Sequence, residues 1–117
     1  FSIVMPAYNA GPFIGEAIES VLAQSFDDWE LVIVDDCSTD NTRDIASRYA
    51  GWHNNIRLYK RDSNSGSAYT PRKEAIILSE GRYIVPLDAD DVFSKKYTHV
   101  LLIRVLIRYI AVLCTVT

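Results

Sequence analysis

Short apolar runs alternate with amphipathic stretches along most of this chain, and that alternation predicts its fold. Residues 1–5 are apolar apart from Ser2, residues 31–34 are continuously apolar, and turn-forming or acidic residues follow each run. Residues 56–60 and 83–87 make two further strand-like runs. Apolar runs of about four to eight residues bounded by turn signals are typical of strands buried on both faces. We therefore predict four strands at these positions.

The segments between the strands have helical patterns. Pro12 suits the start of a first helix, and residues 38–41 offer N-cap side chains for a second helix that ends near Gly51. A third helix is predicted from residue 70 to Gly81, because glycine favours helix C-termini. The apolar face of the first helix comprises Phe13, Ile14, Ala17, Ile18, Val21 and Leu22. Strands that alternate with helices indicate an α/β fold with a mostly parallel sheet flanked by helices.

In such sheets, ligands bind beyond the carboxyl ends of the strands. Tyr8 follows the first strand, Asp35 and Asp36 end the second, and Asp88 and Asp90 follow the last. Because these ends meet at one edge of a parallel sheet, the polar and acidic side chains should converge there. This convergence predicts a binding site.

The acidic segment Leu87-Asp88-Ala89-Asp90-Asp91 predicts a cation site. In an extended segment, Asp88 and Asp90 point the same way. Like charges held close resist burial, and carboxylate oxygens are ligands that Mg²⁺ or Mn²⁺ prefers. A solvated acidic turn is the alternative, and the convergence of three strand ends disfavours it.

Length and composition narrow the function. With 117 residues, the chain is at most one domain, and its net charge of -3 argues against a nucleic-acid partner. Cys37 and Cys114 form no disulfide framework, which favours a cytoplasmic location; a position at the inner face of the membrane stays open. Since the first strand starts at Phe1, we expect this chain to be a truncated piece of a longer protein.

Residues 94–117 form a distinct apolar tail after the motif-bearing residues 1–93. We predict a helix to about residue 107 and a possible strand over residues 110–113. A membrane span is the alternative, disfavoured by Arg104 and Arg108. The apolar surface of this tail predicts self-association.

Three motifs together resemble family 2 glycosyltransferases. They are residues 2–9 (SIVMPAYN), 32–40 (VIVDDCSTD) and 87–91 (LDADD), and residues 17–25 and 80–84 fit the same pattern. The resemblance covers residues 1–93. It is specific because the order and the separations of the motifs match the family, as well as their amino acids. It implies a GT-A fold, that is, a Rossmann-like sheet that binds a nucleoside-diphosphate sugar for transfer to an acceptor hydroxyl.

The resemblance also implies roles for the residues at the first two strand ends. Pro6 and Ala7 would line the base pocket, and the ring of Tyr8 would pack on the nucleobase. Asp36 would accept a hydrogen bond from a uracil N–H, which favours a UDP-sugar. Asp35 would touch the base or ribose, or else cap its own loop.

The remaining implied roles concern the diphosphate. Arg72 would contact it, although the usual small residues before this arginine are replaced here by residues 69–71. Asp88 would face the ribose or a metal-bound water, Asp90 would hold Mn²⁺ or Mg²⁺, and Asp91 would lie behind them.

The expected activity is inverting sugar transfer, which needs a general base. In the resembling family this base is an acid well downstream of the aspartate motif, and no acidic residue follows Asp91. His99 is a weak substitute, so the catalytic residue is unassigned and expected beyond Thr117. The alternatives are a non-catalytic nucleotide-sugar-binding fragment or a receiver-type phosphoacceptor domain. The sugar and the acceptor are not predicted.

Overall fold

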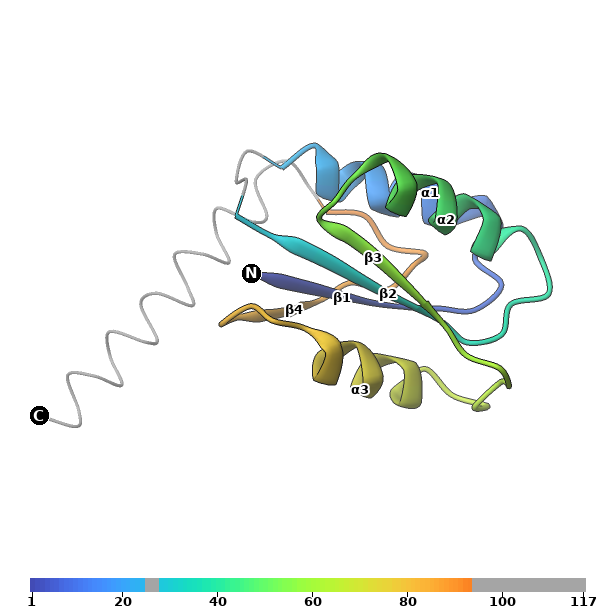
Figure 1. The fold of residues 1–117 in the computed structure, drawn as a ribbon. Helices are drawn as coiled ribbons and strands as arrows, with labels where there is room; N and C mark the ends of the chain where they lie inside the picture. Colours follow the sequence, from blue (N-terminus) through green and yellow to red (C-terminus); the bar gives the residue numbers. More distant parts are fainter. Residues whose placement is uncertain (25–27, 94–117) are drawn as a thin grey trace, which may run out of the picture.

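The computed structural model describes residues 1–24 and 28–93, which form a four-stranded sheet with three helices (Figure 1). Adjacent strands are parallel, in the order β3-β2-β1-β4. The elements in chain order are β1 (Ser2–Ala7), α1 (Gly11–Leu22), β2 (Glu30–Asp35), α2 (Thr42–Trp52), β3 (Ile56–Lys60), α3 (Tyr69–Leu78) and β4 (Ile84–Pro86). The predicted α/β fold with a parallel, helix-flanked sheet is confirmed.

The predictions for residues 94–117, including His99 and Cys114, lie outside the described residues. Among the residues that are described, the helices are too short or too polar for any of them to cross a membrane.

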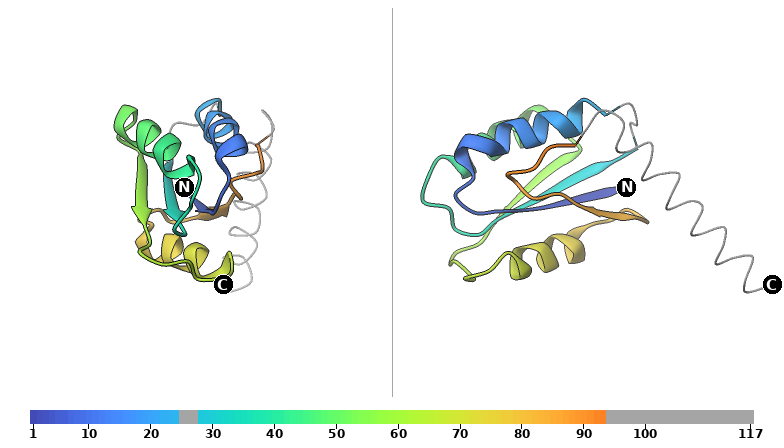
Figure 2. Two further views of the ribbon diagram at one scale, coloured as in Figure 1. Left: turned by 90° about the vertical axis from the view of Figure 1, so that its right-hand side faces the viewer. Right: turned by 180° about the vertical axis from the view of Figure 1, so that it is seen from behind.

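Helices cover both faces of the sheet: α1 and α2 lie over one face, and α3 lies over the other (Figures 1 and 2). Because side chains alternate along a strand, Ile3 and Met5 pack towards α1, whereas Val4 packs towards Ala75 of α3. All of these side chains are at most 2% exposed. The continuous apolar runs in the sequence therefore reflect two cores, one on each side of the sheet.

β1 continues through Pro6, the turn-forming residue that follows the run predicted at residues 1–5. Leu87 N donates to Val4 O at 3.0 Å, so the backbone groups of Val4, and two residues later of Pro6, face the β4 side. The pairing of β4 with β1 runs only from Ser2 to Val4. The N–H that Pro6 lacks is therefore not needed for pairing, and Pro6 stays in the strand.

Gly81 does not end α3, contrary to the sequence prediction. The helix stops at Leu78, and Gly81 N donates to Ser2 Oγ at 2.7 Å. A Cβ on Gly81 would lie 2.4 Å from Ser2 Oγ and 2.9 Å from Ser2 N. The absence of a side chain at this position permits the close approach of the α3–β4 connection to β1.

Phe13 is a second correction. Its side chain is 51% exposed, whereas Ile14, Ala17, Ile18 and Val21 form the buried face of α1. Phe13 lies at the margin of the helical face, on the side that borders the site described next.

Candidate functional site

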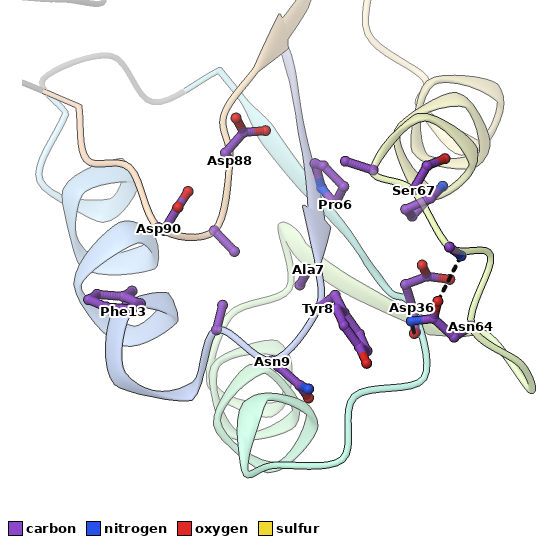
Figure 3. A pocket seen from close by; sticks show the side chains of 15 residues that line it. Pro6, Ala7, Tyr8, Asn9, Phe13, Asp36, Asn64, Ser67, Asp88 and Asp90 are labelled. Carbon is purple, nitrogen blue, oxygen red and sulfur yellow. Dashed lines mark hydrogen bonds between the residues drawn. The ribbon is translucent and has the colours of Figure 1, made fainter.

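A pocket of about 450 Å³ opens at the carboxyl ends of β1 and β2 (Figure 3). This volume is in the usual range for sites that hold small molecules. Its lining contains six of the eight residues that the sequence analysis assigned to the site: Pro6, Ala7, Tyr8, Asp36, Asp88 and Asp90. The other two, Asp35 and Arg72, are not part of this lining. The structure therefore brings the ends of three strands together around one space.

At one end of the pocket lies Asp36, beside the half-exposed ring of Tyr8 (Figure 3). The Asp36 carboxylate is 3% exposed and lies in an ion pair with Arg61, whose Nε is 2.9 Å from Oδ1. Ser65 N donates to Oδ1 at 3.0 Å, and Ser65 Oγ donates to Oδ2 at 2.8 Å. Contacts from the β3–α3 loop thus hold this acid in one orientation.

Asp35 lies outside the pocket lining, although it is the neighbour of Asp36. Its fully buried carboxylate accepts hydrogen bonds from Ser38 Oγ and from Arg43 Nε, the latter at 2.8 Å. Successive side chains of a strand point to opposite faces, so Asp35 faces α2. This placement fits the loop-capping alternative that the sequence left open.

At the other end of the pocket, residues 88–91 form a turn rather than the extended segment that the sequence suggested. Asp91 N donates to Asp88 O at 3.0 Å. The buried side chains of Leu87, Ala89 and Phe93 anchor the turn. Phe93 N also donates to Ser20 Oγ of α1 at 2.9 Å.

This turn brings Asp91 into the acidic group. One carboxylate oxygen each from Asp88, Asp90 and Asp91 lies within 4.8 Å of the others. Arg72 Nη2 donates to Asp88 Oδ1 at 2.8 Å, while Asp90 and Asp91 are exposed. Three carboxylates and one paired guanidinium leave the group with excess negative charge, and their hard oxygen atoms fit a divalent cation such as Mg²⁺ or Mn²⁺.

Arg72 belongs to a neighbouring hollow of about 390 Å³. Asp88 lines both the hollow and the main pocket, so the Arg72–Asp88 ion pair lies at the border between them. The side chain of Arg72 is 37% exposed and comes from the first half of α3.

Several lining residues were not assigned to the site from the sequence. They are Asn9, Ala10, Phe13, Asn64, Gly66, Ser67, Ala68, Pro71 and Ala89. Many belong to the polar loop after β3, and the rule that ligands bind beyond strand ends could have found this loop as well. No sequence signal marked Phe13, because its apolar character matched the core pattern of α1.

The fold and the pocket define an α/β domain with a small-molecule site at the carboxyl edge of a parallel sheet. The profile of the family described as Glycosyl transferase family 2 matches residues 2–116. The chain belongs to this family, which confirms the resemblance seen in the sequence and displaces the receiver-type alternative.

Relatives and solved structures agree with this membership. TuaG of Bacillus subtilis, named for a role as a glycosyltransferase in teichuronic acid biosynthesis, is 44% identical over 94 residues, which cover 80% of this chain and 37% of TuaG. Staphylococcus aureus TarS 1–349 in complex with UDP-GlcNAc superposes with a TM-score of 0.81 at 34% identity, covering 87% of this chain and 30% of TarS 1–349.

A third similarity is more distant. The mannosyltransferase PcManGT from Pyrobaculum calidifontis, solved with GDP-Man and Mn²⁺, gives a TM-score of 0.72 at 27% identity over 81% of this chain and 29% of that one. The chain thus spans well under half the length of each of these proteins. The GT-A neighbours confirm the fold class.

Proposed function

We propose that this chain forms the nucleotide-sugar-binding part of a glycosyltransferase that uses a UDP-sugar. The observation that carries the proposal is a single pocket with an aromatic ring and a buried acid at one end and a group of carboxylates at the other. A nucleoside diphosphate has matching ends, namely a base and a charged diphosphate. The structures of TarS and PcManGT were solved in complex with UDP-GlcNAc and GDP-Man, respectively.

The base end follows from Tyr8 and Asp36. The ring of Tyr8, 52% exposed at the pocket, offers a flat apolar face for stacking. Pro6 and Ala7 line the floor beside it. Asp36, held by Arg61 and Ser65, accepts a hydrogen bond from the ring N–H of uracil.

The diphosphate end follows from the acidic turn. Asp90 and Asp88 hold Mn²⁺ or Mg²⁺, and the bound cation supplies Lewis-acid stabilisation of the leaving diphosphate. Arg72 fixes the direction of the Asp88 carboxylate through their ion pair. Its remaining N–H groups suit the diphosphate oxygens. Asp35, buried against Arg43, serves the loop rather than the ligand.

Sugar transfer needs further residues. Each acid that lines the pocket already has a task, since Asp36 binds the base while Asp88 and Asp90 hold the cation. We therefore expect the general base of an inverting transfer to come from residues beyond Thr117. A cytoplasmic location and self-association are further proposals from the sequence.

Titration calorimetry with UDP, with and without Mn²⁺, tests the binding proposal. Asp90→Asn should weaken Mn²⁺-dependent UDP binding roughly tenfold or more, the equivalent of one lost charged contact. Asp44→Asn, which removes an exposed acid of α2, is the matched control and should bind as the wild type does. Equal affinity in Asp90→Asn and wild type would contradict the metal assignment, and failure of the wild type to bind UDP would contradict the function.

A glycosyl-transfer assay tests the proposal that the general base lies outside these 117 residues. The 117-residue chain should bind a UDP-sugar and hydrolyse it slowly at most, because loss of a general base alone costs about 10²–10⁴-fold in rate. Efficient glycosyl transfer by this chain would show that one of its own residues is the base.

A further inference from the structure

We propose that Arg61 and Ser65 determine which nucleobase this pocket accepts, because they fill all but one of the acceptor positions of Asp36. This inference rests on the proposed function. It concerns two residues of the β3–α3 loop that are absent from the pocket lining. They act on the ligand through Asp36, as positioning residues.

The Asp36 carboxylate has a limited number of acceptor positions. A carboxylate has two oxygen atoms and about four lone-pair positions. Ser65 N donates mainly to Oδ1 at 3.0 Å, since its second arm, to Oδ2, is longer at 3.3 Å. Arg61 Nε lies against Oδ1 at 2.9 Å, as an ion pair rather than an aligned hydrogen bond. Ser65 Oγ takes one position on Oδ2 at 2.8 Å. One acceptor position, on Oδ2, is then left for a ligand.

Other contacts hold these two residues in place. Arg61 N donates to Asp35 O at 2.9 Å, and the Arg61 guanidinium also pairs with Glu74 of α3. The hydrogen bond that Arg61 donates to Glu74 and the charges of Glu74 and Asp36 raise the pKa of Arg61 further above its usual range. Ser65 Oγ also accepts a hydrogen bond from Ser67 N at 3.4 Å. Asp36 therefore cannot turn its second oxygen towards the pocket without breaking several contacts.

This limit separates nucleobases by their hydrogen-bond donors. Uracil has a single ring N–H, which one acceptor position satisfies. Guanine presents a ring N–H and an amino group side by side, and a carboxylate satisfies both only when two of its acceptor positions are open. In this pocket one guanine donor would stay unpaired, and an unpaired buried donor discriminates strongly against a ligand. The arrangement selects a base with one N–H.

The experiment measures the dissociation constants of UDP and GDP with Mn²⁺ in the wild type and in variants of the loop. The wild type should prefer UDP. Ser65→Ala frees a second position on Oδ2, and Arg61→Gln removes the cation at Oδ1. Each should narrow the ratio of GDP to UDP dissociation constants about tenfold, mainly through tighter GDP binding.

Two further variants serve as controls. Ser63→Ala makes the same substitution at an exposed serine of the same loop and should leave the ratio unchanged. Arg61→Lys keeps the charge and should retain more of the UDP preference than Arg61→Gln. Thermal unfolding checks that each variant is folded, and the conservative Ser65→Ala decides the matter if Arg61→Gln does not fold.

The outcomes separate this inference from the proposed function. If the wild type binds UDP but folded Ser65→Ala keeps the same ratio, the inference is wrong and the function stands. A wild type that binds UDP and GDP equally overturns the inference in the same way. A merely structural role would weaken both nucleotides together and leave the ratio unchanged, and a wild type that binds neither nucleotide contradicts both proposals.

Discussion

Replacement of Asp35 by asparagine tests whether the first acid of the aspartate pair supports the fold or the ligand. The carboxylate is fully buried and accepts hydrogen bonds from Ser38 and Arg43. Asparagine keeps the shape, but it removes the charge and replaces one acceptor oxygen with an N–H donor. That donor would face groups that themselves donate. Asp35→Asn should therefore destabilise the fold and leave the pocket unchanged.

The magnitude follows from the exposure of the two partners. Loss of one partner of a fully buried ion pair costs about 3–5 kcal/mol. The side chain of Arg43 is 33% exposed, so water screens the pair and can solvate the guanidinium after the change. Arg43 also keeps its hydrogen bond to Arg61 O at 3.2 Å. We therefore expect a loss of about 2–3 kcal/mol in the free energy of unfolding.

Urea denaturation followed by circular dichroism measures this loss. The midpoint should fall while the slope with urea stays the same. Asp62→Asn, at an exposed acid of the nearby loop, is the control and should change stability by less than about 0.5 kcal/mol. A loss for Asp35→Asn as small as that of the control would refute the structural role. Full stability with roughly tenfold weaker UDP binding would show that Asp35 contacts the ligand instead.

Further predictions concern two glycines and one acid. Gly81→Ala should destabilise the fold by about 1–3 kcal/mol, because its Cβ would lie 2.9 Å from the backbone nitrogen of Ser2 and 3.0 Å from the carbonyl carbon of Phe1. Gly51→Ala, in α2 with open space around the new Cβ, should stabilise by about 0.5–1 kcal/mol; equal melting temperatures for the two variants would contradict both. Burial raises the pKa of Glu30, but hydrogen bonds from Ser2 and Arg57 lower it below its usual 4.5 overall. The stability that the Glu30 carboxylate contributes is therefore present above pH 4.5 and is lost as the pH falls through its lower pKa in the folded state. In Glu30→Gln, the free energy of unfolding should fall less at acid pH than in the wild type, and an identical pH dependence in the two proteins would contradict this prediction.

Much of the fold is determined by the local pattern of the sequence. The run at residues 31–34 is apolar throughout and lies within β2 (Glu30–Asp35), and β3 (Ile56–Lys60) matches the prediction residue for residue. Strands buried on both faces need cover on both sides, so helices between them and parallel pairing follow. The position of acids at strand ends could also be predicted, because a parallel sheet collects those ends at one edge.

Only the tertiary structure decided which of these residues face the ligand. Asp35 and Asp36 are the same amino acid, but Asp35 is buried against Arg43 of α2 whereas Asp36 lines the pocket. Phe13 matched the core pattern and lies at the pocket, while Gly81 matched a helix end and instead permits contact with β1. The partners Arg61 and Arg72 reach their aspartates across 25 and 16 positions of sequence. Contacts at such separations depend on how the layers pack, and no local periodicity records them.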